Sequence, residues 1–209
     1  MKKLLALVAV GLAFQAQAMD PSSLRVKVYK VAFSTSVDCT NLQTVYEGSA
    51  SDATFVDFLN NPVIAENASL ADGTYKCVAI EMSDLIKFTP TTSSGACVAD
   101  QEETLDVCRG SDGGTYELID GTQGTCDNTY GTDDRVTLWL SQGSTATGGG
   151  GGANGFTRPT SDSDSANGFN LSSPFVKSGA ATGIFYVDGT GQVTGGGSCD
   201  MQPPAFGFR

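Results

Sequence analysis

The amino-acid sequence predicts an all-β protein, an antiparallel β-sandwich with disulfides and a long loop rich in Gly, Ser and Asp. Three observations lead to this fold class. Short stretches alternate between apolar and polar residues, which is the period of a half-buried strand. Turn-forming residues are abundant, with 26 glycines among 209 residues, whereas helix-forming runs of Ala, Leu, Glu and Lys are scarce. Six cysteines follow the N-terminal segment.

Residues 1–18 have the pattern of a secretory signal peptide. A basic start precedes the apolar run 4–14, which is too short to span a bilayer, and the small residues at 16–18 form a cleavage site before Met19. An uncleaved anchor is the alternative. We therefore predict a bacterial exported protein, located in the periplasm, on the outer surface or outside the cell, with residues 19–209 forming a single β-sandwich domain of a size that buries about 70% of its unfolded surface.

Loss of the leader removes two lysines, so the count of Lys and Arg falls from 12 to 10 against 23 Asp and Glu, a net charge of −13. Such a charge repels nucleic-acid phosphates and anionic lipids. We expect no nucleic-acid partner, and no membrane span after cleavage, because no further long apolar run follows. Polysaccharide or other envelope proteins are the partners that we consider.

The segment 69–88 carries the clearest strand pattern and is predicted to be central. An Ala-Asp-Gly turn at 71–73 leads into it. Beyond the turn, Val78, Ile80 and Met82 share one face, while the opposite face is only half polar. Both faces are therefore expected to be covered, as in an inner strand with a purely structural role.

The remaining elements follow in order along the chain. The segment 23–33 is a strand with apolar residues on both faces. Residues 53–59 are a short strand that runs into a turn at 60–62, although their spacing also fits a helix. Further strands are predicted at 42–46, 115–119, 135–140, 182–187 and 192–194, the last two joined as a hairpin by the turn 188–191.

Residues 141–173 are predicted to be a flexible, Gly-rich insertion. Five consecutive glycines at 148–152 and many Ser, Asp and Asn residues cannot bury enough apolar surface to offset the entropy of ordering. Phe156, Phe169 and Leu171 are the residues expected to pin the loop locally. After this loop, the C-terminal tail is expected to be held by Cys199 and two phenylalanines.

An even number of cysteines in an exported chain predicts disulfides, each contributing roughly 3 kcal/mol. Sequence alone does not select the pairing. Our predicted set is Cys39–Cys77, Cys97–Cys108 and Cys126–Cys199.

One stretch resembles a known family. Val56-Asp57-Phe58-Leu59, a loop, and then Ser69-Leu70-Ala71-Asp72-Gly73-Thr74-Tyr75 are similar to the prealbumin-like β-sandwich of bacterial envelope proteins, in which a hairpin of this form recurs. The resemblance covers about residues 22–90, and the chain after Pro90 does not follow it. It implies an exported sandwich and no particular activity.

Histidine is absent from the chain. Consequently there is no Ser-His-Asp triad, no Cys-His pair and no His-ligated metal. No phosphate-binding glycine motif is present either. Paired carboxylates of the glycosidase kind remain open, but we predict that the protein is not an enzyme and needs no cofactor.

Calcium is the one ion that the sequence keeps in consideration. Asp127, Asn128, Asp133 and Asp134 form an oxygen-rich cluster around a turn. The segment 162–168 resembles the start of a calcium loop, but its twelfth position is Ser173 and not the usual Glu. The alternative is that these residues simply build loops.

Trp139 is the single tryptophan, and the predicted register places it beside Arg135 and Thr137, opposite the core face. An exposed indole ring could stack on a sugar, which makes these three residues the candidate ligand site. The alternative is that Trp139 packs under the Gly-rich loop or in a second core.

These observations together predict an exported, non-enzymatic structural or binding module of the bacterial cell envelope or surface. One alternative is a carbohydrate-binding module that uses Trp139. The other is a surface-filament subunit assembled by strand exchange, for which residues 19–33 are the expected exchanging segment.

Overall fold

The computed structural model describes residues 18–49, 51, 53–60, 70–109, 114–146, 155–179 and 183–209. Within these ranges every regular element is a β-strand, which confirms the predicted all-β class. No helix in the same ranges is long and apolar enough to cross a membrane. The predicted signal peptide and the run of five glycines lie outside the described residues, apart from Ala18.

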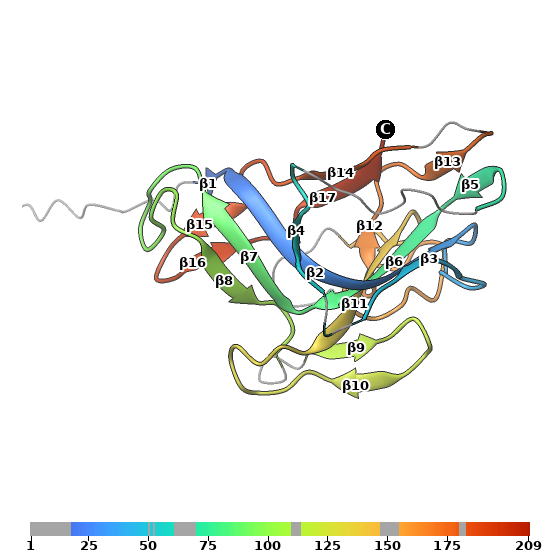
Figure 1. The fold of residues 1–209 in the computed structure, drawn as a ribbon, viewed down its shortest axis with the longest axis horizontal. Coiled ribbons are helices and arrows are strands. Elements are labelled where there is room, and N and C mark those ends of the chain that lie inside the picture. The colour runs from blue at the N-terminus through green and yellow to red at the C-terminus, as the bar shows by residue number, and fades with distance from the viewer. Residues whose placement is uncertain are drawn as a thin grey trace, which may run out of the picture.

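Strand β2 (Pro21–Ser34) is the centre of the largest sheet (Figure 1). Along one edge it pairs with β6 (Cys77–Ser83) and then β7 (Leu85–Pro90), which are separated by Asp84 alone. Along its other edge it pairs with β3 (Gln43–Glu47) and β4 (Phe55–Asp57). Beyond β6 and β7 the sheet continues as two separate strands, because β11 (Arg135–Ser141) pairs with β6 and β8 (Glu103–Asp106) pairs with β7.

The inner position of β6 confirms the prediction made for the segment 69–88. All seven of its residues are buried, and it lies between β2 and β11. The antiparallel register brings Ile80 opposite both Val31 and Leu138. Period-two alternation sends these side chains to the same face, so the apolar pattern of one strand is completed by its two neighbours.

A β-bulge in β2 explains why its apolar residues occupy both parities of the sequence. The register with β6 shifts between Val28 and Lys30. An extra residue in one strand moves every later side chain to the opposite face. Val26 before the bulge and Val31 after it therefore both enter the main core.

Smaller sheets cover the large one. In Figure 1, β14 (Phe185–Asp188) and β17 (Ala205–Phe208) lie along one side of the large sheet, and β9 (Thr115–Glu117) and β10 (Gln123–Thr125) lie at the bottom of the view. The other small sheets are β1 (Ala18–Met19) with β15 (Val193–Gly195) and β16 (Cys199–Met201), and β5 (Gly73–Tyr75) with β13 (Phe175–Lys177). A short β12 (Phe169–Asn170) extends the large sheet parallel to β11.

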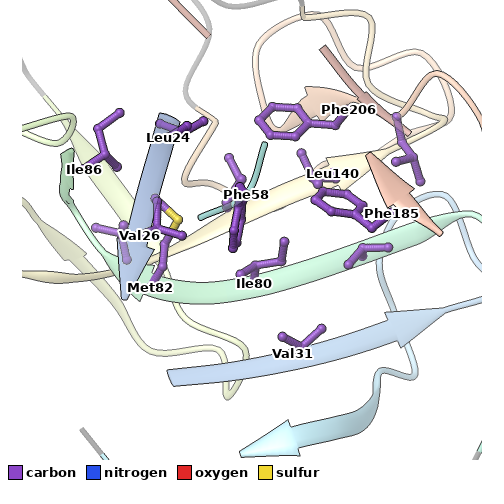
Figure 2. Packing of buried hydrophobic residues seen from close by; sticks show 14 of the residues in the cluster. Leu24, Val26, Val31, Phe58, Ile80, Met82, Ile86, Leu140, Phe185 and Phe206 are labelled. Carbon is purple, nitrogen blue, oxygen red and sulfur yellow. The ribbon is translucent and has the colours of Figure 1, made fainter. Parts of the chain in front are cut away.

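The main core fills the space between the large sheet and the C-terminal strands. Figure 2 shows Phe185 and Phe206 facing Ile80 and Leu140, with Phe58 among them. The rings of Phe58 and Phe185 meet edge to face, with centroids 6.1 Å apart, a geometry that aromatic pairs prefer. This packing ties the tail to the sheet and confirms the prediction that the tail is held down.

A second, smaller core lies on the opposite face of the large sheet. It contains Cys39, Cys77, Ala79 and Trp139, with Leu42 and Ile119 packed at its margin. Residue Ile119 follows β9, so the β9–β10 hairpin is the element that closes this face. The predicted partial cover on the second face of the 69–88 strand is therefore confirmed.

Two predicted elements differ from the structure. The segments 182–187 and 192–194 do not form a hairpin, because β14 pairs with β17 and β15 pairs with β1 and β16. Apolar burial decides this pairing, since Phe185 and Phe208 are direct partners with ring centroids 5.2 Å apart. Strand β10 was also missed, because its Gln-Gly-Thr sequence has no apolar alternation.

The described part of the predicted insertion 141–173 packs on the sheet and is not a free linker. The N–H of Trp139 donates to the carbonyl of Gly155, and that of Glu117 donates to the carbonyl of Phe156. Leu171 is buried, and Phe156 and Phe169 pack against the main core. The pinning by these three residues is thus as predicted. Backbone bonding to β9 and β11 supplies the order that composition alone did not indicate.

One of the three predicted disulfides is confirmed. Cys39 pairs with Cys77, whereas the other two pairs are Cys97–Cys199 and Cys108–Cys126. The predictions of Cys97–Cys108 and Cys126–Cys199 are wrong, because strand order places the cysteines differently. The segment that carries Cys97 lies against β15, where Gly95 and Gly195 approach backbone to backbone, and β16 brings Cys199 to the same place.

Candidate functional site

Trp139 is not the exposed platform that sugar binding requires. Its side chain is only 1% exposed and lies in the second core. The indole Nε1–H donates to the backbone carbonyl of Glu117 at 2.9 Å, so its polar atom is also satisfied. The proposal of a sugar site on this ring is therefore corrected, and the second-core alternative describes the residue.

Arg135 and Thr137 share the face of Trp139 but are also engaged or covered. The Arg135 guanidinium forms an ion pair with the carboxylate of Glu81 and lies 5.2 Å from the centre of the Tyr29 ring. The other Glu81 oxygen, Oε1, accepts a hydrogen bond from the N–H of Ile119. Thr137 is fully buried. These contacts attach the β9–β10 hairpin to the sheet. Trp139 and Thr137 are buried, and Arg135, although exposed, is held in its ion pair with Glu81.

Three of the four residues predicted as a calcium cluster, Asp127, Asp133 and Asp134, already have hydrogen-bond or ion-pair partners within the protein, and Asn128 is exposed. The carboxylate of Asp127 accepts the N–H of Thr129, and that of Asp134 accepts the N–H of Asp127. The Asp133 carboxylate bonds the Lys27 ammonium at 2.7 Å. Burial raises the pKa of Asp133, but the Lys27 bond and other hydrogen bonds outweigh it and lower the pKa. Among the described residues, no three His, Cys, Asp or Glu side chains gather as metal ligands.

The calcium-loop-like segment 162–168 is organised by one carboxylate. Asp164 accepts hydrogen bonds from the N–H groups of Thr160, Ala166 and Asn167. Burial raises the pKa of Asp164, yet these bonds dominate and hold it well below its ordinary value. The side chain therefore serves as an internal cap for the loop, the role that the loop-building alternative describes.

Two carboxyl groups that sequence reasoning did not single out, those of Asp84 and Asp106, form the most unusual cluster among the described residues. Asp84 lies at the break between β6 and β7, and Asp106 ends β8; they are 1% and 4% exposed. Asp84 Oδ1 accepts the N–H of Asp134, and Asp106 Oδ2 accepts the N–H of Gly131. The second oxygen of each, Asp84 Oδ2 and Asp106 Oδ1, has no hydrogen-bond partner in the described chain.

The electrostatics of Asp84 follow from this position. Burial raises its pKa from 3.8 to about 7, and the negative charge of Asp106 adds to the effect. Perturbed groups of this kind are enriched at functional sites. Here, however, the carboxyl is covered by the loop 127–134, so a substrate has no access to it. The only sequence signal was the Ser-Asp that interrupts two otherwise regular strands.

A cluster of cations around one aromatic ring lies on the surface of β2, β4 and β7. We call this cluster of Phe55, Arg25, Lys27 and Lys87 the Phe55 surface. The ammonium or guanidinium groups of Arg25, Lys27 and Lys87 lie 4.9 to 5.6 Å from the centre of the Phe55 ring. Glu102 forms ion pairs with Arg25 and Lys87. Three cations thus surround one half-buried aromatic ring in a chain whose overall charge is strongly negative.

The segment predicted for strand exchange is the least suited to leave the fold. Residues 19–33 comprise most of β2, which has partners on both edges. An exchanging strand is normally an edge strand, whose departure exposes little of the core. Filament assembly through this segment would require the large sheet to come apart.

No protein family, no curated protein and no solved structure matches this chain. The resemblance to a prealbumin-like sandwich therefore stays a prediction. In the structure, β4 pairs with β2 and β5 pairs with β13, while the connecting residues 61–69 lie outside the described ranges. The class that the structure defines is an all-β protein cross-linked by three disulfides.

Proposed function

We propose that this protein is an exported, non-enzymatic structural or binding module of the bacterial cell envelope or surface. The observation that carries the proposal is the set of three intrachain disulfides. Disulfides persist in oxidising compartments, whereas cytosolic thiols are kept reduced. The predicted leader supports the same location. Cleavage before Met19 would also leave a first residue whose side chain, 4% exposed, already belongs to the core.

The burial of the chemically unusual groups supports a role through shape. Asp84 is the carboxyl whose pKa is raised furthest toward neutrality, and it is closed beneath the loop 127–134. A general acid must come within hydrogen-bond reach of its substrate. The chain also lacks histidine, the commonest catalytic acid and base. These features favour a scaffold over a catalyst.

Among the described residues, the Phe55 surface is the feature best suited to bind a partner. An aromatic ring bordered by cations fits an anionic group, as found on an acidic polysaccharide or on another envelope protein. Substitution of Arg25 and Lys87 by glutamine removes two of the cations and keeps a polar, uncharged side chain at each position. Binding to isolated envelope fractions is expected to fall in this variant, with Lys177→Gln on β13 as the control.

The experiment that tests the proposal follows the full-length gene product in a bacterial host. We expect the chain in the periplasm, on the surface or in the medium, with all cysteines oxidised and no turnover of glycan or ester substrates. Recovery of the folded protein in the cytosol with free thiols would refute export. Turnover of a substrate by the purified chain, abolished by substitution of a carboxylate, would refute the non-enzymatic role.

A further inference from the structure

Asp84 and Asp106 approach one another from adjacent strands. Asp106 is in register with Leu85, the neighbour of Asp84, and the N–H of Val107 donates to the Asp84 carbonyl at 3.0 Å. Both carboxyl groups also hold the same loop, at Gly131 and at Asp134. Both carboxyl groups therefore lie beneath the residues 127–134, between the ends of β11 and β8, and the negative charge of Asp106 acts on Asp84.

The hydrogen bonds of the four carboxyl oxygens of Asp84 and Asp106 restrict which oxygen can carry a proton. Asp84 Oδ1 and Asp106 Oδ2 already accept N–H groups, and the remaining oxygens, Asp84 Oδ2 and Asp106 Oδ1, are buried without partners. Two ionised carboxylates cannot satisfy each other, because both are acceptors only. One proton between them removes a buried charge and satisfies both oxygens together.

We propose that Asp84 carries a proton on Oδ2 and donates it in a hydrogen bond to Oδ1 of the Asp106 carboxylate, and that this bond fastens the loop 127–134 to the sheet. Protonation belongs on Asp84 because it is the deeper of the two and has lost more solvent. A divalent cation fits less well, since calcium seeks six to eight oxygen ligands and only two unpartnered carboxylate oxygens lie here.

The charges around Asp84 agree with a neutral group. Asp106 faces it from β8, and Asp133 and Asp134 face it from the segment before β11. On the β2 side, Lys27 and the Tyr29 hydroxyl both bond to Asp133 rather than to Asp84. The nearby negative charges therefore outnumber the one cation that offsets them, and each of them raises the pKa of Asp84 after the larger effect of burial.

The direction of the pH dependence follows from this raised pKa. A group whose pKa is higher in the folded state stabilises the fold fully below its unfolded value and loses that stabilisation as pH rises through the folded value. For Asp84 these values are 3.8 and about 7. The hydrogen bond between Asp84 and Asp106 is therefore formed in mildly acidic solution. It is lost as the pH rises through neutrality, and the loop 127–134 is then held less firmly to the sheet.

The test uses the mature, oxidised chain with ¹³C-labelled aspartate, followed by NMR from about pH 4 to about pH 9. One carboxyl resonance is expected to titrate with a midpoint of about 7, and the amides of Gly131 and Asp134 should exchange more rapidly above it. Asp84→Asn should remove that resonance and keep both amides protected at high pH, because its amide donates to Asp106 as the protonated carboxyl does.

Asp188→Asn is the matched control, since Asp188 also accepts one backbone N–H, from Thr190, but is exposed at the end of β14. It should leave the midpoint unchanged. The proposal is overturned if every aspartate of the wild-type protein titrates below about pH 5. It is equally overturned if added calcium at high pH protects the two amides in the wild type, which would place a cation between the carboxylates. Both decisive readings are made on the wild type, so failure of the variant to fold does not affect them.

Discussion

The indole Nε1–H of Trp139 donates to the backbone carbonyl of Glu117 across 2.9 Å, which joins the centre of β11 to the β9–β10 hairpin. A second link lies alongside, because the guanidinium of Arg158 bonds the Glu117 carboxylate at 3.0 Å. The single tryptophan thus closes the outer face of the large sheet. Its role is to hold a small second core together, and it is not the exposed ring for sugar stacking that the sequence analysis considered.

Replacement of Trp139 by Phe should destabilise the fold by about 2 kcal/mol, because the Glu117 carbonyl loses a buried partner and the second core loses volume. Chemical unfolding followed by circular dichroism measures the change. Val176→Ala, at an exposed position on β13, is the control and should stay within about 0.5 kcal/mol. Equal stability of the Trp139 variant and the wild type would contradict the second-core assignment.

The disulfides should differ in their contributions according to the loops that they close. Sequence separations are 102 for Cys97–Cys199, 38 for Cys39–Cys77 and 18 for Cys108–Cys126. Restriction of the unfolded chain then predicts losses of roughly 5, 4 and 3 kcal/mol when each pair is replaced by serines. Unfolding midpoints of the three double variants should follow that order, and the reverse order would count against an unfolded-state origin.

Substitution of Gly195 by alanine should destabilise the fold, whereas the same substitution at the neighbouring Gly196 should not. An added Cβ at Gly195 would lie 1.7 Å from the carbonyl oxygen of Ser94, whereas at Gly196 nothing lies within 4 Å. Gly195→Ala is therefore expected to cost about 2 kcal/mol or more, because the two backbones must separate. Gly196→Ala should be almost neutral. Thermal unfolding of the two variants decides, and identical midpoints would show that these backbones are not in contact.

Asp164 should stabilise its loop in a pH-dependent manner opposite to that of Asp84. Since hydrogen bonds outweigh burial and lower its pKa below 3.8, its contribution is present above that value and is lost as the pH falls through the folded value. Asp164→Ala should therefore be less stable than the wild type at neutral pH, with the difference shrinking in strong acid. Asp162→Asn, exposed on the same loop, is the control. A difference that grows on acidification would refute this role.

The strand pattern was largely predictable because alternation and turns act locally. The inner position of β6 followed from apolar residues on both faces, and the bulge in β2 explains the double apolar pattern of residues 23–33. Long-range pairing was less accessible. The partner of Phe185 is Phe208, and nothing in the local sequence distinguishes that strand from the nearby hairpin candidate.

The candidate site was harder to predict for a related reason. Trp139 was predicted on the correct face of its strand. Its burial, however, depends on the β9–β10 hairpin, and strand β10, with the sequence Gln-Gly-Thr, was not predicted. Asp127, Asn128, Asp133 and Asp134 were placed in the correct loop, yet Asp84 and Asp106 reach that loop from distant strands. An acidic residue at a strand end is common, and only the three-dimensional structure shows that two of them are buried together.

Mass spectrometry of the protein purified from its host tests the central claim, that this is an exported module cross-linked through its cysteines. We predict an intact chain that begins at Met19 and peptides that join Cys39 to Cys77, Cys97 to Cys199, and Cys108 to Cys126. A chain that still begins at Met1 and carries six reduced thiols would contradict it.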